Sequence, residues 1–276
     1  MISTEMRTLS CLAVVARNLA CMLTPTVSTR FGIIQGFALP GVDEFLGIPY
    51  AEPPRRFADP VDWTAKYPNG TWKATNKPSV CVQPVDKAQT VWTGSEDCLY
   101  LNVWRPSAVS DAEKLADSLP VLLFIHGGSF LIGDGSQYNA STLAFKHRAL
   151  YVTTNYRLGA LGFAQVAPGR GNFGLKDQRS AMRWVSNHIR SFRGDASRVL
   201  IFGESSGAMS VAHHLLYPPP EQLFHAALMQ SGMAQATFQS AALAVKTVSP
   251  PCALPCLTPC MPPRRAPCNS SPSPAA

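Results

Sequence analysis

At 276 residues, with 46% apolar and 15% charged residues, the chain has the composition of an ordinary globular protein, which excludes a fibrous or wholly disordered chain. The formal net charge is +7, but residues 31–240 carry 18 Lys and Arg against 16 Asp and Glu, a net of +2. That region has no basic stripe interleaved with aromatic residues, and no apolar run in the sequence is long enough to span a bilayer. We therefore expect neither nucleic-acid binding nor a transmembrane segment.

Residues 1–30 form a separate leader. Arg7 precedes a short apolar run over residues 9–16, which Arg17 and Asn18 interrupt. Both a cleaved signal peptide and an unstructured leader fit this pattern. The first implies the secretory pathway or secretion, and the second leaves the cytoplasm as the alternative.

Residues 31–240 alternate apolar strand-like runs with amphipathic segments, a pattern that predicts an α/β domain. The later strands are almost entirely apolar, as expected for central parallel strands that are buried on both faces. Apolar residues spaced by three and four predict a helix from Leu175 to about Ser191. The expected strands cover residues 31–38, 44–48, 98–104, 120–125, 150–155, 198–203 and 224–230.

Residues 241–276 differ sharply from the rest, with nine prolines, four cysteines and no acidic residue. Proline at that density opposes both helix and interior strand, so we expect a disordered tail. A zinc site is the alternative interpretation, but no histidine accompanies the four cysteines. The same abrupt change is typical of an out-of-frame final exon, the interpretation that we favour. We expect no metal and no cofactor.

The strongest chemical signal is the sequence G-E-S-S-G from Gly203 to Gly207. An all-apolar strand over residues 199–202 precedes it, and a helix-compatible run over residues 208–216 follows it. This order is the one that a nucleophile elbow requires. The glycines relieve clashes across the tight turn, and the helix dipole points at the developing oxyanion. The pattern predicts Ser205 as a catalytic nucleophile.

A second signal follows the expected strand over residues 120–125. The loop begins with His126 and Gly127, and Gly128 and Ser129 come next. A glycine-rich loop at this place lets backbone N–H groups form an oxyanion hole with the N–H of Ser206. A plain strand-ending turn is the alternative, and the elbow downstream favours the oxyanion hole.

With these motifs in place, the chain resembles the type-B carboxylesterase/lipase family, to which the cholinesterases belong. The matching stretches cover residues 31–233 in the family's order. They are Phe192 to Gly207, Glu96 to Val103, Phe45 to Ala51, Asn155 to Gly159 and Gly171 to Arg179.

The resemblance implies an α/β-hydrolase fold, a small-molecule ester as substrate and a role for each matching residue. Ser205 would be the nucleophile, with oxyanion donors at Gly128, Ser129 and Ser206, Gly127 in the same loop and Glu204 as a supporting carboxylate. Structural pairs would be the disulfide Cys81–Cys98 and the ion pairs Arg56–Glu96 and Arg157–Asp177. Two departures stand out. The family usually has a third glycine at position 129. The Cβ of Ser129 would narrow the acyl pocket. The choline-binding tryptophan has no clear counterpart, although Trp92 lies nearby.

A serine hydroxyl needs a general base and a carboxylate that orients it, and in this fold both follow the serine. His213 and His214 lie too far along the helix that begins at the serine, and His225 opens the next strand at the wrong end. We therefore expect a fold that stops after the elbow helix and the following strand, and a chain that is inactive by itself. A non-catalytic, cholinesterase-like adhesion module is the alternative, but such relatives typically lose the serine. The oligomeric state and the preferred acyl and alcohol groups stay open.

Overall fold

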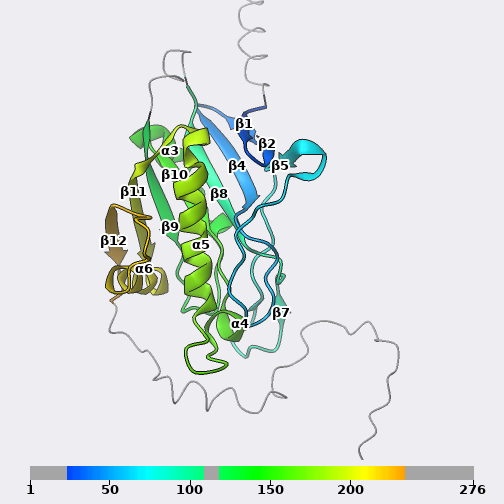
Figure 1. Ribbon diagram of the computed structural model, residues 1–276, viewed down its shortest axis with the longest axis vertical. Coiled ribbons are helices and arrows are strands. Elements are labelled where there is room, and N and C mark those ends of the chain that lie inside the picture. The colour runs from blue at the N-terminus through cyan, green and yellow to red at the C-terminus, as the bar shows by residue number, and fades with distance from the viewer. Residues whose placement is uncertain (1–23, 109–117, 234–276) are drawn as a thin grey trace, which may run out of the picture.

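The computed structural model describes residues 24–108 and 118–233 (Figure 1). The expectations for the leader up to residue 23 and for the tail from residue 241 lie outside these ranges. The folded part already includes Thr26–Thr29, so it extends into the segment that the sequence pattern sets apart as a leader. In the described ranges, no helix has both the length and the apolar character needed to cross a bilayer.

A seven-stranded mixed sheet forms the centre of the molecule. Four neighbouring strands run parallel, and the remaining three continue the sheet in antiparallel pairs. In spatial order the strands are β12 (Ala226–Gln230), β11 (Gly194–Glu204), β9 (Leu119–Ile125), β10 (Leu150–Thr154), β8 (Tyr100–Pro106), β4 (Val42–Pro49) and β3 (Phe37–Leu39).

Two small sheets lie beside the main one. One joins β1 (Thr26–Thr29), β2 (Gly32–Gln35) and β5 (Thr71–Lys73), and the other pairs β6 (Gln83–Pro84) with β7 (Trp92–Thr93). The single strand predicted over residues 31–38 was therefore wrong, because it divides at Gly36 between two sheets. A Cβ at Gly36 would lie 2.5 Å from the carbonyl oxygen of Glu44, so the chain crosses its neighbour closely there.

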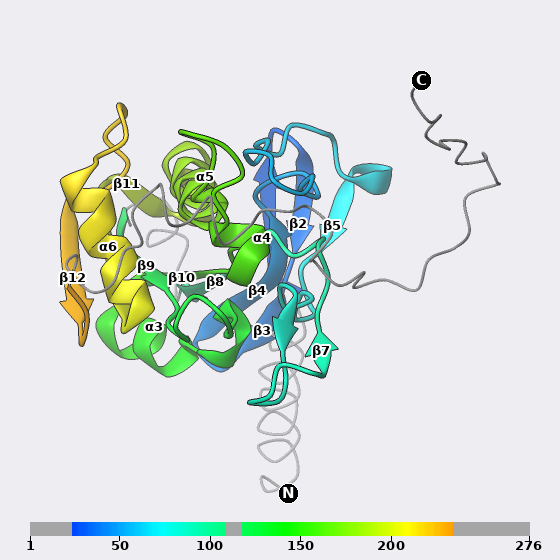
Figure 2. The same ribbon diagram turned by 90° about the horizontal axis from the view of Figure 1, so that it is seen from below.

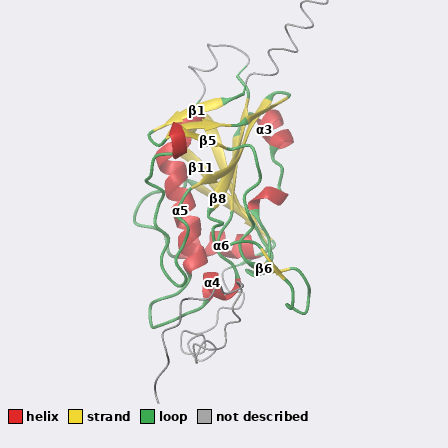
Figure 3. Cartoon of the chain, turned by 90° about the vertical axis from the view of Figure 1, so that its right-hand side faces the viewer, coloured by secondary structure: helices red, strands yellow, loops and turns green. Residues whose placement is uncertain are grey.

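Helices cover both faces of the main sheet (Figures 2 and 3). The predicted helix over residues 175–191 is present with shifted ends, since α5 stops at His188 and a 3-10 turn follows. The helices are α3 (Ser141–His147), α4 (Gly159–Phe163), α5 (Phe173–His188) and α6 (Ser206–Leu216), and the 3-10 turns are η1 (Pro68–Gly70), η2 (Gly135–Gln137) and η3 (Ile189–Phe192).

Strand β9 shows how the sheet divides its side chains. Val121, Leu123 and Ile125 belong to the large core that includes residues of α5 and α6. Leu122, which points to the other face, packs in a second core with Ala144 of α3. This alternation is the period of two that a strand imposes. It explains why an almost entirely apolar strand is needed where helices cover both faces.

The topology brings two loops to one edge of the sheet. Strands β9 and β11 are parallel neighbours that end together, with Ile125, the last residue of β9, opposite Gly203, the residue before the last of β11. The loops that follow both strands must therefore leave the sheet side by side. Ligand sites in open α/β sheets gather at such carboxyl ends.

Candidate active site

Ser205 is the junction between β11 and α6, and its backbone is strained. Its φ of 56° and ψ of −122° lie outside the regions that a residue with a Cβ usually occupies. Two hydrogen bonds hold it there: its N–H donates to the carbonyl of Gln230 at 2.8 Å, and its carbonyl accepts from the N–H of Met209 at 3.0 Å. Strain that the surroundings enforce in this way is characteristic of functional positions.

The two glycines that flank this turn are required by close backbone contacts. A Cβ at Gly203 would lie 2.5 Å from the carbonyl carbon of Gly207, across the turn. A Cβ at Gly207 would lie 2.1 Å from the carbonyl oxygen of Ile125, at the end of β9. The glycines therefore allow the turn to close and let α6 begin directly against the strand that carries the second loop.

That second loop, residues 127–133, contacts the serine at its first residue. A Cβ at Gly127 would lie 3.2 Å from the Cβ of Ser205 and 2.9 Å from a carboxylate oxygen of Glu204. Further along, the N–H of Phe130 donates to the hydroxyl of Ser206 at 3.3 Å. The structure thus brings the predicted oxyanion loop and the predicted nucleophile together.

Ser129 takes a conformation that favours glycine. Its φ is 57°, and the preceding Gly128 has a φ of 105°. The left-handed region costs a residue with a Cβ roughly 1–2 kcal/mol. The turn is closed by the carbonyl of Gly128, which accepts from the N–H groups of Leu131 and Ile132, both at 3.0 Å. The side chain of Ser129 is exposed, so its Cβ is tolerated without a packing clash.

All six histidines lie in the described residues, and no hydrogen bond given for that part of the chain joins one of them to the hydroxyl of Ser205. Four of them hydrogen-bond to other groups, and the remaining two pack against aromatic rings. The hydrogen-bond partners are Gly127 O for His126, the Tyr151 hydroxyl for His147, the Gln178 side chain for His214 and Val199 N–H for His225; the aromatic neighbours are Phe31 and Trp184 for His188 and Tyr217 for His213.

Three of these histidines are buried, and in His188 burial first, and the Arg30 charge second, lower the pKa to about 4. His126 stacks on Tyr156, and burial lowers the pKa of its ring to about 4. His214 lies between Gln178 and Arg179, where burial first, and the Arg179 charge second, lower its pKa to about 3. An imidazole held neutral in this way adds stability only while the unfolded chain is neutral as well.

We expect the protein to lose stability as the pH falls below about 6.5, the value of an exposed histidine. In that pH range the histidines of the unfolded chain become protonated, whereas the buried histidines of the folded chain stay neutral. Each buried histidine then removes up to about 1.4 kcal/mol per pH unit, down to its folded pKa. Denaturant unfolding at pH 7 and pH 5 measures the loss, and His214→Asn should remove about a third of it, since three buried histidines contribute. An unchanged pH dependence in that variant would contradict the assignment.

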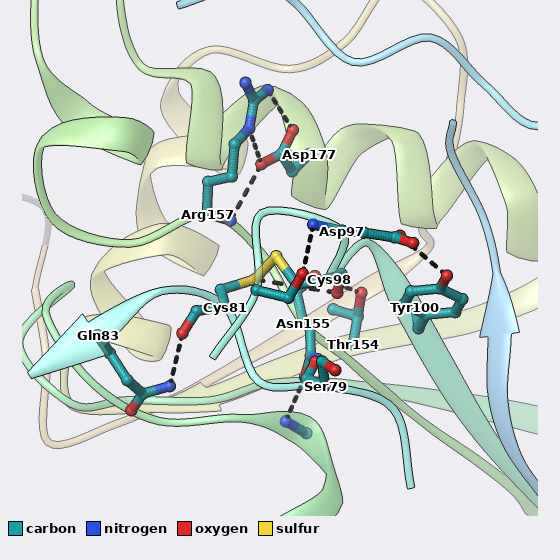
Figure 4. The surroundings of a disulfide bond; sticks show 12 residues. Ser79, Cys81, Gln83, Asp97, Cys98, Tyr100, Thr154, Asn155, Arg157 and Asp177 are labelled. Atoms are coloured by element: carbon teal, nitrogen blue, oxygen red, sulfur yellow. Dashed lines mark hydrogen bonds and ion pairs between the residues drawn. A yellow bond between two sulfur atoms is a disulfide. The ribbon is translucent and has the colours of Figure 1, made fainter. Parts of the chain in front are cut away.

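The predicted disulfide is formed, with Cα atoms of Cys81 and Cys98 5.0 Å apart (Figure 4). Close to it, Arg157 makes a bidentate pair with Asp177 at 2.8 and 2.6 Å, and both side chains are buried. The second expected pair, Arg56 with Glu96, lies nearer the surface, with its shortest contact at 2.5 Å. The first pair ties the loop after β10 to α5, and the second ties Arg56 to the disulfide-closed segment.

The sequence patterns did not identify the two residues that bind the backbone at the ends of the loop of residues 127–133. The hydroxyl of Tyr156 donates to the carbonyl of His126 at 2.7 Å. The side-chain amide of Gln83 binds Gly133 at the other end of the loop. Tyr156 lies in the matching stretch Asn155 to Gly159, but no role follows from that match, and Gln83 lies in none of the stretches, so only the tertiary contacts identify their roles. Within the described ranges, no group of His, Cys, Asp or Glu has the arrangement of a metal site.

A sequence profile of the Carboxylesterase family matches residues 23–250. The chain is 39% identical to an acylcarnitine hydrolase of Mus musculus over 76% of its length and 40% of that protein. It is 40% identical to the para-nitrobenzyl esterase of Bacillus subtilis (75% of this chain, 43% of that one) and 41% identical to an acetylcholinesterase of Electrophorus electricus (75% and 35%). A solved thermophilic PNB esterase superposes with a TM-score of 0.72 and 37% identity, over 81% of this chain and 47% of the other. The chain thus spans less than half the length of each of these proteins.

Proposed function

Since this chain belongs to the carboxylesterase family, we propose that it is the part of a carboxylic ester hydrolase that supplies the nucleophile and the oxyanion donors. The observation that carries this proposal is the strained backbone of Ser205, held at the end of β11 with Gly127 against its side chain. Small-molecule esters are the proposed substrate class, since relatives that bear esterase names share this part of the sequence.

In the proposed reaction, the hydroxyl oxygen of Ser205 attacks the carbonyl carbon of the ester. The N–H groups of Gly128, Ser129 and Ser206 stabilise the resulting oxyanion, and the dipole of α6 adds to that field. The alcohol then leaves, and water hydrolyses the acyl-serine. Proton transfer in both steps requires a general base oriented by a carboxylate.

The positions of the histidines support a further proposal, that the 276-residue chain does not turn over esters by itself. A serine hydroxyl without a base is a weak nucleophile. His213 and His214 lie seven and eight residues after the start of α6, roughly 10–12 Å along its axis. The ring of His126 faces the carbonyl of Gly127 and has a pKa too low to take a proton near neutral pH.

We expect the purified chain to hydrolyse a p-nitrophenyl ester no faster than its Ser205→Ala variant. An oxyanion hole without the base gives a rate about 10³–10⁴-fold above that in water, but only in enzymes whose folds are otherwise complete. Labelling by an organophosphate should likewise stay below stoichiometric. A rate that is clearly above background and disappears in Ser205→Ala would contradict this expectation, since one of the six histidines would then act as the base.

We also propose that the protein folds in the secretory pathway. The support is the buried disulfide between Cys81 and Cys98, since such bonds persist in oxidising compartments and are rare in the cytosol.

A further inference from the structure

Gln83 lies inside the disulfide-closed segment and is almost completely buried, with 8% of its surface exposed. Its amide oxygen accepts from the N–H of Gly133 at 2.8 Å. Its amide nitrogen donates to the carbonyl of Gly133 and to the carbonyl of Cys81, both at 3.0 Å. One side chain thus satisfies both backbone groups of Gly133, as a neighbouring strand would.

Gly133 transmits this contact to the start of the loop. Its φ is 114°, and a Cβ there would lie 2.6 Å from Nδ1 of His126 and 2.8 Å from the carbonyl oxygen of Gly127. The same carbonyl oxygen lies 2.8 Å from Nδ1 of His126. Gly133 therefore packs directly on the peptide that joins Gly127 to Gly128.

The orientation of that peptide decides where the N–H of Gly128 points. The C=O and N–H of a trans peptide point in opposite directions. With the carbonyl of Gly127 fixed on the ring of His126, the N–H of Gly128 is directed away from that ring. A Cβ at Gly127 would lie 3.2 Å from the Cβ of Ser205, so the series of contacts ends beside the serine.

A second buried amide strengthens the same junction. Asn155 accepts from the N–H of Gly135 at 2.8 Å and donates to the carbonyl of Ser79 at 3.1 Å. Ser79 lies two residues before Cys81, and Gly135 two residues after Gly133 (Figure 4 shows the Asn155–Ser79 contact). The chain at the disulfide and the chain that leaves the loop are thus bridged twice by side-chain amides.

We propose that Gln83 is a positioning residue, through which the segment closed by Cys81 and Cys98 holds the loop of residues 127–133 in the shape that presents its N–H groups to Ser205. That these N–H groups serve as oxyanion donors rests on the proposed function. That the amide of Gln83 orders the whole loop rests on the contacts alone.

The test is amide hydrogen exchange of the full chain, resolved by residue. The N–H groups of Phe130, Leu131 and Ile132 are the reporters, because their acceptors are Ser206 and Gly128 and not Gln83. Gln83→Leu should lower their protection about tenfold, the equivalent of one buried hydrogen bond of about 1.4 kcal/mol, while the amides of β9 keep theirs. Gln89→Leu, an exposed glutamine in the same segment, is the matched control and should change nothing.

Gln83→Glu separates hydrogen bonding from packing within one folded protein. At low pH the protonated acid can accept from Gly133 and donate to one carbonyl, as the amide does. At high pH the carboxylate faces two carbonyl oxygens and loses its donor. We expect loop protection, measured relative to β9, to resemble the wild type below the titration of the new carboxyl and Gln83→Leu above it. Gln89→Glu should show no such change.

Loss of protection at Gly133 alone, with Phe130, Leu131 and Ile132 unchanged, would overturn the proposal. So would a pH-independent Gln83→Glu variant. Replacing Cys81 and Cys98 by serine should release the same amides, since the disulfide closes the segment that carries Gln83. Because the readout is amide exchange, it does not depend on whether Ser205 acts as a nucleophile, and failure of the proposed function would leave this result standing.

Discussion

Replacing Gly207 by alanine is expected to destabilise the protein by about 2–4 kcal/mol, although the residue lies in a helix. Helix propensity alone predicts the opposite sign, a gain of up to about 1 kcal/mol. The added Cβ would lie 2.1 Å from the carbonyl oxygen of Ile125, a backbone atom that cannot rotate away. Either α6 or the end of β9 must shift, and with it the loop that begins at His126. Denaturant unfolding of the two proteins measures the difference.

Gly169→Ala is the matched control for this expectation. Gly169 has a φ of 72°, and a Cβ there would meet nothing within 4 Å. Its replacement should therefore cost only the left-handed backbone strain, roughly 1 kcal/mol. If Gly207→Ala stabilised the protein, the turn at Ser205 would have room for a Cβ beside the carbonyl of Ile125, which would contradict the expectation.

Replacing Asp177 by asparagine is expected to cost about 3–5 kcal/mol. The Asp177 carboxylate is fully buried and receives three hydrogen bonds from Arg157, including one from its backbone N–H at 3.0 Å. The variant would leave the guanidinium of Arg157 buried without its counter-charge, with hydrogen bonds to the carbonyls of Ala58 at 2.8 Å and Arg55 at 3.4 Å. Thermal or denaturant unfolding reports the loss.

Asp59→Asn makes the same chemical change in the exposed pair Asp59–Lys176 and should cost less than about 1 kcal/mol. The double variant Arg157→Met/Asp177→Leu removes both buried charges and should lose less than Asp177→Asn does, because no unpaired charge remains. If Asp177→Asn cost no more than Asp59→Asn, the buried pair would not hold the loop after β10 to α5.

The sequence predicts those helices and strands whose pattern of apolar residues is visible within the element itself. Strand β9 is apolar throughout and β11 is apolar over residues 199–202, so these strands are recognised without tertiary information. The short strands β6 and β7 have two residues each, and α3 has seven, too few for a period to show. The division at Gly36 depends on the carbonyl of Glu44 across the sheet, a contact that local pattern cannot show.

The candidate site divides in the same way. Ser205 and Gly127 follow strands that the sequence identifies, and the parallel order of β9 and β11 then places them together. Gln83 and Tyr156 act through a single amide and a single hydroxyl on backbone carbonyls. Many polar side chains can donate to a backbone carbonyl, and the tertiary structure decides which of them lies close enough. Side-chain–backbone contacts between distant segments are therefore the part that sequence patterns do not predict.

The assignment of Ser205 as the nucleophile is tested most directly in a chimera, in which residues 24–233 replace the matching part of the Bacillus subtilis para-nitrobenzyl esterase. We expect a folded chimera to hydrolyse p-nitrophenyl acetate and to be labelled by an organophosphate at Ser205. Ser205→Ala should abolish the label and lower the rate by a factor of about 10⁴ or more. A folded chimera that hydrolyses the ester equally well with alanine at position 205, or that never takes up the label, would contradict the assignment.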